Sequence, residues 1–122
     1  MGLLSCTTTK ATDPTGPNYS AIVQGVYKMT YIAYNGGTGT AVSNPSDNVL
    51  VNYYSNAEVS IKEVIGNNAI NFPQVMLVDA GSNKLTFSQN NGSQSISGYF
   101  LNRSIEYTLI DGSTSKSVKA HL

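Results

Sequence analysis

The sequence has few of the residue types on which catalytic and metal sites most often depend. Its 122 residues include one cysteine, one histidine and no tryptophan. One cysteine cannot form a disulfide within the chain or a metal site built from several thiolates. The histidine, His121, lies beside the last residue, where a strand end frays, so we do not expect it to act as a catalytic base. We therefore predict no enzymatic activity, no bound metal and no cofactor.

Charged side chains are also scarce. They make up 11% of the residues and their formal charges cancel, whereas about 25% is typical of a globular domain. No basic stripe is present, which argues against a nucleic-acid partner. Glu58 and Glu63 are five residues apart in a predicted hairpin and should lie on opposite faces of it unless a bulge intervenes. We interpret them as solvated carboxylates near Lys62 and Arg103 rather than as a glycosidase pair.

Long hydrophobic runs are missing as well. No segment approaches the roughly 20 consecutive apolar residues that a transmembrane helix needs. No window repeats apolar residues at helical spacing, and a helix could form only around residues 18–24, where it would be short. The chain therefore has to build its core from strands.

From Ala21 onward, runs of β-forming residues alternate with turn clusters such as Asn35-Gly36-Gly37 and Asn90-Asn91-Gly92. Pro73 interrupts the most apolar run, residues 70–80, and cannot donate to a sheet. That run is therefore an edge strand or begins at Gln74. We predict an all-β fold: an antiparallel meander of about eight strands that closes as a small barrel, with a β-sandwich as the alternative. Residues 21–122 form this domain.

Eight tyrosines are the most suggestive set of side chains. Alternation places Tyr27 and Tyr31 on one face of the strand at residues 25–34, together with Met29 and Ala33. A tyrosine offers an apolar ring and a hydroxyl group, which suits a pocket wall or a sugar-stacking surface, although β-sheets also use tyrosine to fill cores. The side chains that we expect to contact a ligand, as a pocket wall and not as catalysts, are Tyr27, Tyr31, Tyr53 and Tyr107.

The N-terminus predicts where the protein works. Leu3-Leu4-Ser5-Cys6 matches the end of a bacterial lipoprotein signal, which makes Cys6 the residue that would carry lipid; the alternative is an incidental thiol. Residues 7–18 are rich in hydroxyl groups, Pro and Gly, as in a flexible tether. Five residues are too few to direct export, so we interpret residues 1–20 as a signal remnant and tether. The predicted location is the bacterial cell envelope, outer-membrane or periplasm-facing, and a truncated, unlipidated chain should be soluble.

The chain resembles the small lipocalin-like, calycin-type lipoproteins of bacterial envelopes. The matching segments are the lipobox-like Leu3-Leu4-Ser5-Cys6, the opening strand Gly25-Val26-Tyr27-Lys28-Met29-Thr30, the hairpin from Val49-Leu50-Val51 to Val59-Ser60-Ile61, and the pair from Ser97-Gly98-Tyr99 to Ile105-Glu106-Tyr107. Tyr27 stands where the family usually has tryptophan, and the domain is shorter than an ordinary lipocalin. The resemblance implies a barrel with a ligand site at its mouth and a smaller cavity.

These features predict a monomeric, non-enzymatic envelope protein that binds a small apolar or amphiphilic molecule at the mouth of its barrel. The membrane is contacted only through the lipid anchor. This hypothesis requires a cavity that is open at one end. The alternative is a glycan- or protein-binding module, such as an accessory of polysaccharide uptake or a hydrolase inhibitor, with a packed core and tyrosines on an exposed patch. An enzyme would need His121 and a carboxylate in one cleft.

Overall fold

The computed structural model describes residues 17–122, so Cys6 and most of the predicted tether lie outside the described part of the chain. The predicted all-β fold is confirmed. One short helix precedes ten strands: α1 (Tyr19–Val23), β1 (Gly25–Tyr34), β2 (Thr40–Ala41), β3 (Asn48–Ser55), β4 (Glu58–Ile65), β5 (Asn68–Met76), β6 (Val78–Asp79), β7 (Leu85–Asn91), β8 (Gln94–Leu101), β9 (Ser104–Asp111) and β10 (Thr114–His121).

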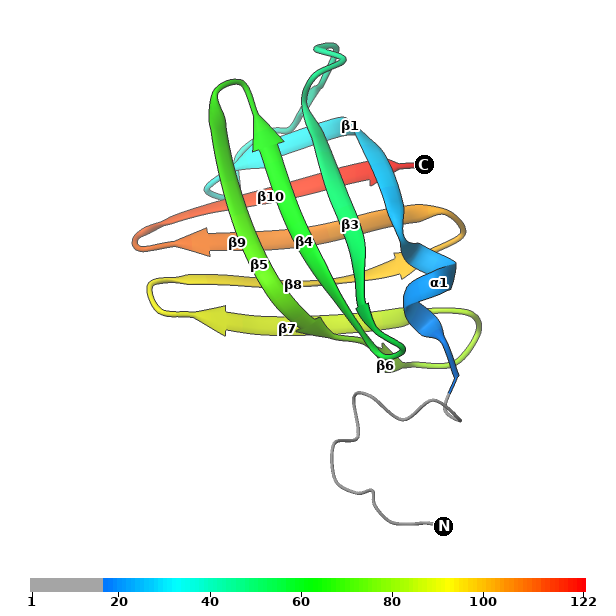
Figure 1. Ribbon diagram of the computed structural model, residues 1–122. Helices are drawn as coiled ribbons and strands as arrows, with labels where there is room; N and C mark the ends of the chain where they lie inside the picture. The colour runs from blue at the N-terminus through cyan, green and yellow to red at the C-terminus, as the bar shows by residue number, and fades with distance from the viewer. Residues whose placement is uncertain (1–16) are drawn as a thin grey trace, which may run out of the picture.

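The strands form one antiparallel sheet that curls into a nearly closed barrel (Figure 1). The order is β5-β4-β3-β1-β10-β9-β8-β7-β6, with β2 paired to β1. The first long strand, β1, pairs with the last, β10, which joins the two halves of the meander. The sheet is not closed by hydrogen bonds between β5 and β7, although these two strands lie next to each other. The chain runs from β5 into β6, and β6 pairs with β7. Because the sheet is continuous, the barrel is formed and not the β-sandwich.

The barrel is filled by the apolar positions of the alternating strands. A single cluster of buried side chains includes Val49 and Val51 of β3, Ile61 of β4 and Phe72 of β5. Each fully buried side chain of this kind contributes about 1.5–3 kcal/mol relative to an exposed one. The strands β3, β4 and β5 cross the layer of β7 to β10 steeply (Figure 1). Inward residues of both halves belong to the one core cluster.

Helix α1 covers one end of the barrel. Asn18 caps it by accepting a hydrogen bond of 3.1 Å from the Ala21 amide. The Ser20 hydroxyl is fully buried and donates to the Glu58 carbonyl at 2.7 Å. The helix lies within residues 18–24, the one place where the sequence allows a helix, and it begins two residues before the predicted domain start at Ala21.

Irregular pairing changes which way several side chains face. A register shift between Met29 and Tyr31 inserts an extra residue in β1, which turns Tyr31 to the outside and Ile32 to the inside. The prediction that Tyr27 and Tyr31 share a face is therefore wrong. Strand β5 is the edge strand predicted from Pro73, which lies within a second register shift between β4 and β5.

The described part of the chain contains no helix with the length and hydropathy needed to cross a bilayer.

The Tyr27 hydroxyl joins the barrel to α1 and predicts a pH effect. It donates to the Val23 carbonyl at 2.6 Å. Burial raises the pKa of Tyr27 to about 12 from the ordinary 10.0, against the opposing charge of Arg103. Its contribution to stability is complete below pH 10.0, where both states hold the proton, and is lost as the pH rises towards about 12.

Replacing Tyr27 with phenylalanine should lower the free energy of unfolding by about 1 kcal/mol at neutral pH, because the hydrogen bond to α1 is lost. The variant should also lose less stability than the wild type between neutral pH and strongly alkaline pH. Urea denaturation across that range measures both effects. Parallel pH profiles for the two proteins would show that the Tyr27 hydroxyl does not cause the alkaline loss.

Candidate functional site

The structure does not bring the four predicted tyrosines to one pocket. Tyr27 and Tyr107 belong to the buried core. Tyr31 lines a groove on the outer face of the sheet. Tyr53 is 51% exposed, and its hydroxyl donates to the Asn56 side chain at 2.8 Å. A pocket wall made of all four is not present, and a ligand role for any one of them remains a prediction.

Sequence reasoning missed a buried polar cluster inside the barrel. Glu63 of β4 is 3% exposed. One of its carboxylate oxygens accepts a hydrogen bond from the Tyr107 hydroxyl, and the other forms an ion pair with the Lys116 ammonium. The Lys116 side chain is 14% exposed. We call these three residues the Glu63 cluster, because the carboxylate lies at its centre.

The environment of the Glu63 cluster changes the pKa of the Tyr107 hydroxyl. Burial raises the pKa of Tyr107 well above 10.0, and the Glu63 charge and hydrogen bond raise it further. Tyr107 is therefore a hydrogen-bond donor at any physiological pH. Among the described residues, no buried side-chain nitrogen or oxygen lacks a hydrogen-bond partner. Each polar side-chain atom of the cluster therefore has at least one partner, which lowers the cost of removing it from water.

The Glu63 cluster borders a cavity at the end of the barrel away from α1, which we call the end cavity. It has a volume of about 400 Å³. It lies at the opposite end of β4 from Glu58, where α1 is anchored. Ile65 and Ile70 give it an apolar wall that packs on the core. Its lining residues are Tyr34, Glu63, Ile65, Asn68, Ala69, Ile70, Asp111 and Lys116.

The prediction that Glu58 and Glu63 are solvated carboxylates is wrong, because both are buried. Glu63 follows Val59 and Ile61 in the inward positions of β4, and Lys116 precedes Val118 and Ala120 in those of β10. The alternation of inward and outward residues along β4 and β10 was therefore the sequence signal that Glu63 and Lys116 face the core. Glu58 has neutral partners instead: Ser55 Oγ donates to it at 3.0 Å and Gln74 Nε2 at 2.8 Å.

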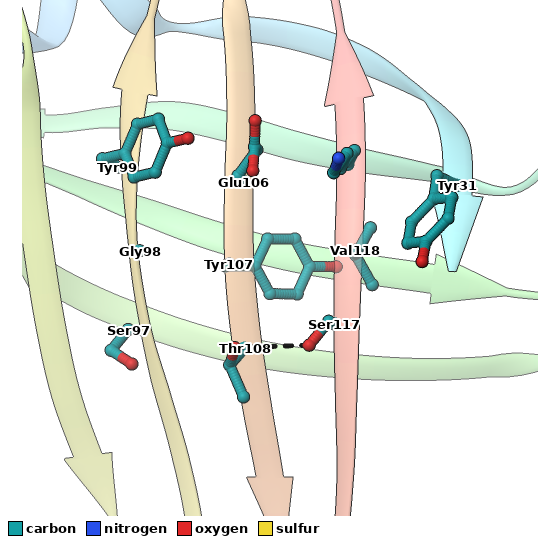
Figure 2. Close-up of a pocket in the computed structure, with 10 residues that line it drawn as sticks. Tyr31, Ser97, Gly98, Tyr99, Glu106, Tyr107, Thr108, Ser117 and Val118 are labelled. Carbon is teal, nitrogen blue, oxygen red and sulfur yellow. Dashed lines mark hydrogen bonds between the residues drawn. The ribbon is translucent and has the colours of Figure 1, made fainter. Parts of the chain in front are cut away.

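A second hollow, which we call the outer groove, lies on the outside of the sheet across β8, β9, β10 and β1 (Figure 2). Its volume is about 210 Å³. Tyr99 and Tyr31 stand at its two sides, with Glu106 between them, while small hydroxyl residues lie below (Figure 2). The lining residues are Tyr31, Ser97, Gly98, Tyr99, Glu106, Tyr107, Thr108, Ser117, Val118 and Lys119.

His121 is exposed at the end of β10, and its Nδ1 lies 3.0 Å from the Leu122 carbonyl. It lines neither the end cavity nor the outer groove. Within residues 17–122, no group of three or more His, Cys, Asp or Glu side chains is placed to hold a metal ion.

Comparisons with known proteins identify a similar fold but no family. No protein family model matches the sequence, and no curated protein matches it in sequence. The structure is similar to the crystal structure of a proposed outer membrane protein from Bacteroides fragilis NCTC 9343, with a TM-score of 0.63 and 13% sequence identity. The match covers 86% of this chain and 53% of that one, so this chain spans about half the length of its structural neighbour. At this identity the likeness is one of fold alone.

Proposed function

We propose that this protein is a non-enzymatic binding protein of the bacterial cell envelope that takes a small amphiphile into its end cavity. The observation that carries the proposal is the Glu63 cluster, which places a buried ion pair in the wall of a 400 Å³ cavity beside an apolar surface. The ligand would set its apolar part against Ile65 and Ile70. Its polar head would meet Glu63 and Lys116.

The energetics of the ion pair support a role beyond stability. Removing two charges from water costs several kcal/mol for each ion, and a packed apolar pair is often as stable or more stable. A buried pair therefore needs another reason to be present, and here it supplies both a donor and an acceptor to the cavity. The Lys116 ammonium has three N–H donors and uses one on Glu63.

The charges of the end cavity favour one kind of head group. Glu63 and Asp111 bring two carboxylates against the single ammonium of Lys116. An anionic head would meet an excess of negative charge, whereas hydroxyl or amide groups can both donate and accept. We therefore expect a neutral, hydroxyl- or amide-bearing amphiphile, such as a monoacylglycerol, rather than a fatty acid.

The envelope location is supported by the structural neighbour, by the N-terminal residues and by the barrel itself. The structural neighbour is described as a proposed outer membrane protein. The N-terminal residues resemble a lipoprotein signal ending at Cys6, and the barrel agrees with the resemblance to small lipocalin-like lipoproteins. Outward strand positions such as Lys28, Lys62 and Lys119 are charged, and the inward ones are mostly apolar apart from Glu58 and the Glu63 cluster, a pattern opposite to that of a lipid-spanning barrel. We infer a monomer held at the membrane by its lipid anchor alone.

Calorimetric titration with monolauroylglycerol and with laurate, each below its micelle concentration, tests the proposal. We expect the neutral amphiphile to bind at least tenfold more tightly than laurate. Ile70→Arg should weaken that binding at least tenfold, since the long charged side chain occupies the end cavity. Val78→Arg is the matched control, because Val78 is an exposed apolar residue that does not line the end cavity. Binding that is equally strong in both variants, or absent for both amphiphiles, would contradict the proposal.

A further inference from the structure

We infer that the outer groove is a saccharide-binding site, separate from the end cavity and independent of the function proposed for it. The inference rests on the order of side chains across the four strands that carry the groove. No interaction of the Glu63 cluster enters it, although Tyr107, whose hydroxyl belongs to that cluster, is also one of the residues that line the groove.

Strand register aligns the outward side chains in two rows. The first row runs Tyr99–Glu106–Lys119–Tyr31, since Tyr99 pairs with Glu106, Glu106 with Lys119, and Lys119 with Tyr31. It spans three strand spacings, about 14 Å. The row thus has two charges of opposite sign in its middle and an aromatic ring at each end.

The two charged side chains in the middle of the row, Glu106 and Lys119, do not form an ion pair with each other. Glu106 and Lys119 face one another, yet the structure, which describes both residues, shows no ion pair between them. The Lys119 ammonium instead lies 5.0 Å from the centre of the Tyr31 ring. Side-chain hydrogen bonding with Glu106 is the main cause that raises the pKa of Tyr99, followed by desolvation and the Glu106 charge. A carboxylate acceptor and an ammonium donor therefore lie next to each other in the middle of the row, between the two rings.

The second row gives the groove its depth. It consists of Ser97, Thr108 and Ser117, which are paired across β8, β9 and β10. These side chains are short, and each hydroxyl can both donate and accept. The Thr108 and Ser117 hydroxyls lie 3.5 Å apart, a weak mutual contact that leaves capacity for a ligand (Figure 2). The three hydroxyl groups therefore form a floor for the groove that can both donate and accept hydrogen bonds.

The two rings that flank the groove are held in place. A side chain at Gly39 would collide with the Tyr31 ring, so the loop backbone lies directly against that ring. The Lys84 ammonium lies 4.3 Å from the centre of the Tyr99 ring. Rings fixed beside hydroxyl-rich surfaces suit a ligand with both apolar C–H faces and hydroxyl edges. A saccharide has both.

A peptide fits the outer groove less well. Each of the four strands is paired on both sides over this region, so no free edge is available for an added strand. The lining offers no deep apolar pocket for an anchoring side chain, because Val118 is the sole aliphatic residue among the ten that line it. Neutral oligosaccharides remain the class whose chemistry matches both rows.

A glycan array of neutral oligosaccharides, followed by calorimetry with those that bind, tests the inference. We expect Glu106→Gln and Lys119→Met each to weaken binding at least tenfold, with circular dichroism and thermal midpoint close to the wild type. Lys62→Met is the matched control, an exposed lysine of β4 outside the groove. Ile70→Arg, which blocks the end cavity, should leave saccharide binding unchanged.

Several results would overturn the inference. They are an array without a bound saccharide, full binding in the Glu106→Gln/Lys119→Met double variant, or a screen in which extended peptides bind the groove and saccharides do not. Loss of saccharide binding in Ile70→Arg would place the sugar in the end cavity instead. Failure of the amphiphile titration has no bearing on these outcomes, since the saccharide probes and the Glu106 and Lys119 variants address the outer groove alone.

Discussion

Replacing Lys116 with methionine should lower the free energy of unfolding by about 3 kcal/mol at neutral pH. The substitution keeps most of the apolar stem but leaves the Glu63 carboxylate, which is 3% exposed, without its counter-charge. Tyr107 can supply one hydrogen bond but no positive charge. Urea denaturation measures the loss.

The double variant Glu63→Gln/Lys116→Met separates charge from packing. A neutral amide can still accept the Tyr107 hydrogen bond, so the double variant should recover most of the stability, to within about 1 kcal/mol of the wild type. The coupling between the two substitutions then measures the interaction of the pair. If the double variant is as unstable as Lys116→Met, the loss comes from packing of the lysine stem and not from the unpaired charge.

Alternation and turn chemistry were enough to predict the fold. Inward positions such as Val49, Val51 and Ile61 follow the period of two, and Asn-Gly turns separate the strands. The prediction failed where the backbone carries an extra residue. Nothing in the local sequence marks the shift between Met29 and Tyr31, and one inserted residue reverses every later side chain of the strand. Tyr31 was therefore assigned to the wrong face.

The candidate sites were less predictable, because they depend on strands that are distant in sequence and in the sheet. The phase of β4 and of β10 marks the positions of Glu63 and Lys116 as inward, a signal that the interpretation of solvated carboxylates overlooked. Their meeting could not be deduced, since β3 and β1 lie between those strands and only the curl of the barrel brings the two side chains together. The outer groove could not be predicted either, because the alignment of its side chains depends on the register of three strand pairs. Interpreting isolated carboxylates as solvated was reasonable on residue type and wrong in this fold.

Gly98→Ala should lower the free energy of unfolding by about 3 kcal/mol, near the upper end of the usual cost of overpacking. Gly98 pairs with Tyr107, and a β-carbon at Gly98 would lie 2.0 Å from the Glu106 carbonyl oxygen and 2.7 Å from the Tyr107 α-carbon. Backbone atoms cannot rotate away as a flexible side chain can, so β8 and β9 must separate locally. Thermal and urea denaturation measure the cost.

Gly98→Ala should also disturb the Glu63 cluster. A shift of the Tyr107 backbone would move the hydroxyl group that donates a hydrogen bond to Glu63. Two control variants show how much of the stability loss is specific to the close contact at Gly98. Gly92→Ala, in the β7–β8 turn at φ 72° with open space around it, should cost about 1 kcal/mol through backbone strain alone. Ser97→Ala, outward on β8, should stay within about 0.5 kcal/mol of the wild type. If Gly98→Ala costs no more than Gly92→Ala, the two strands have room to relax, and the close approach of β9 to Gly98 is not what positions Tyr107.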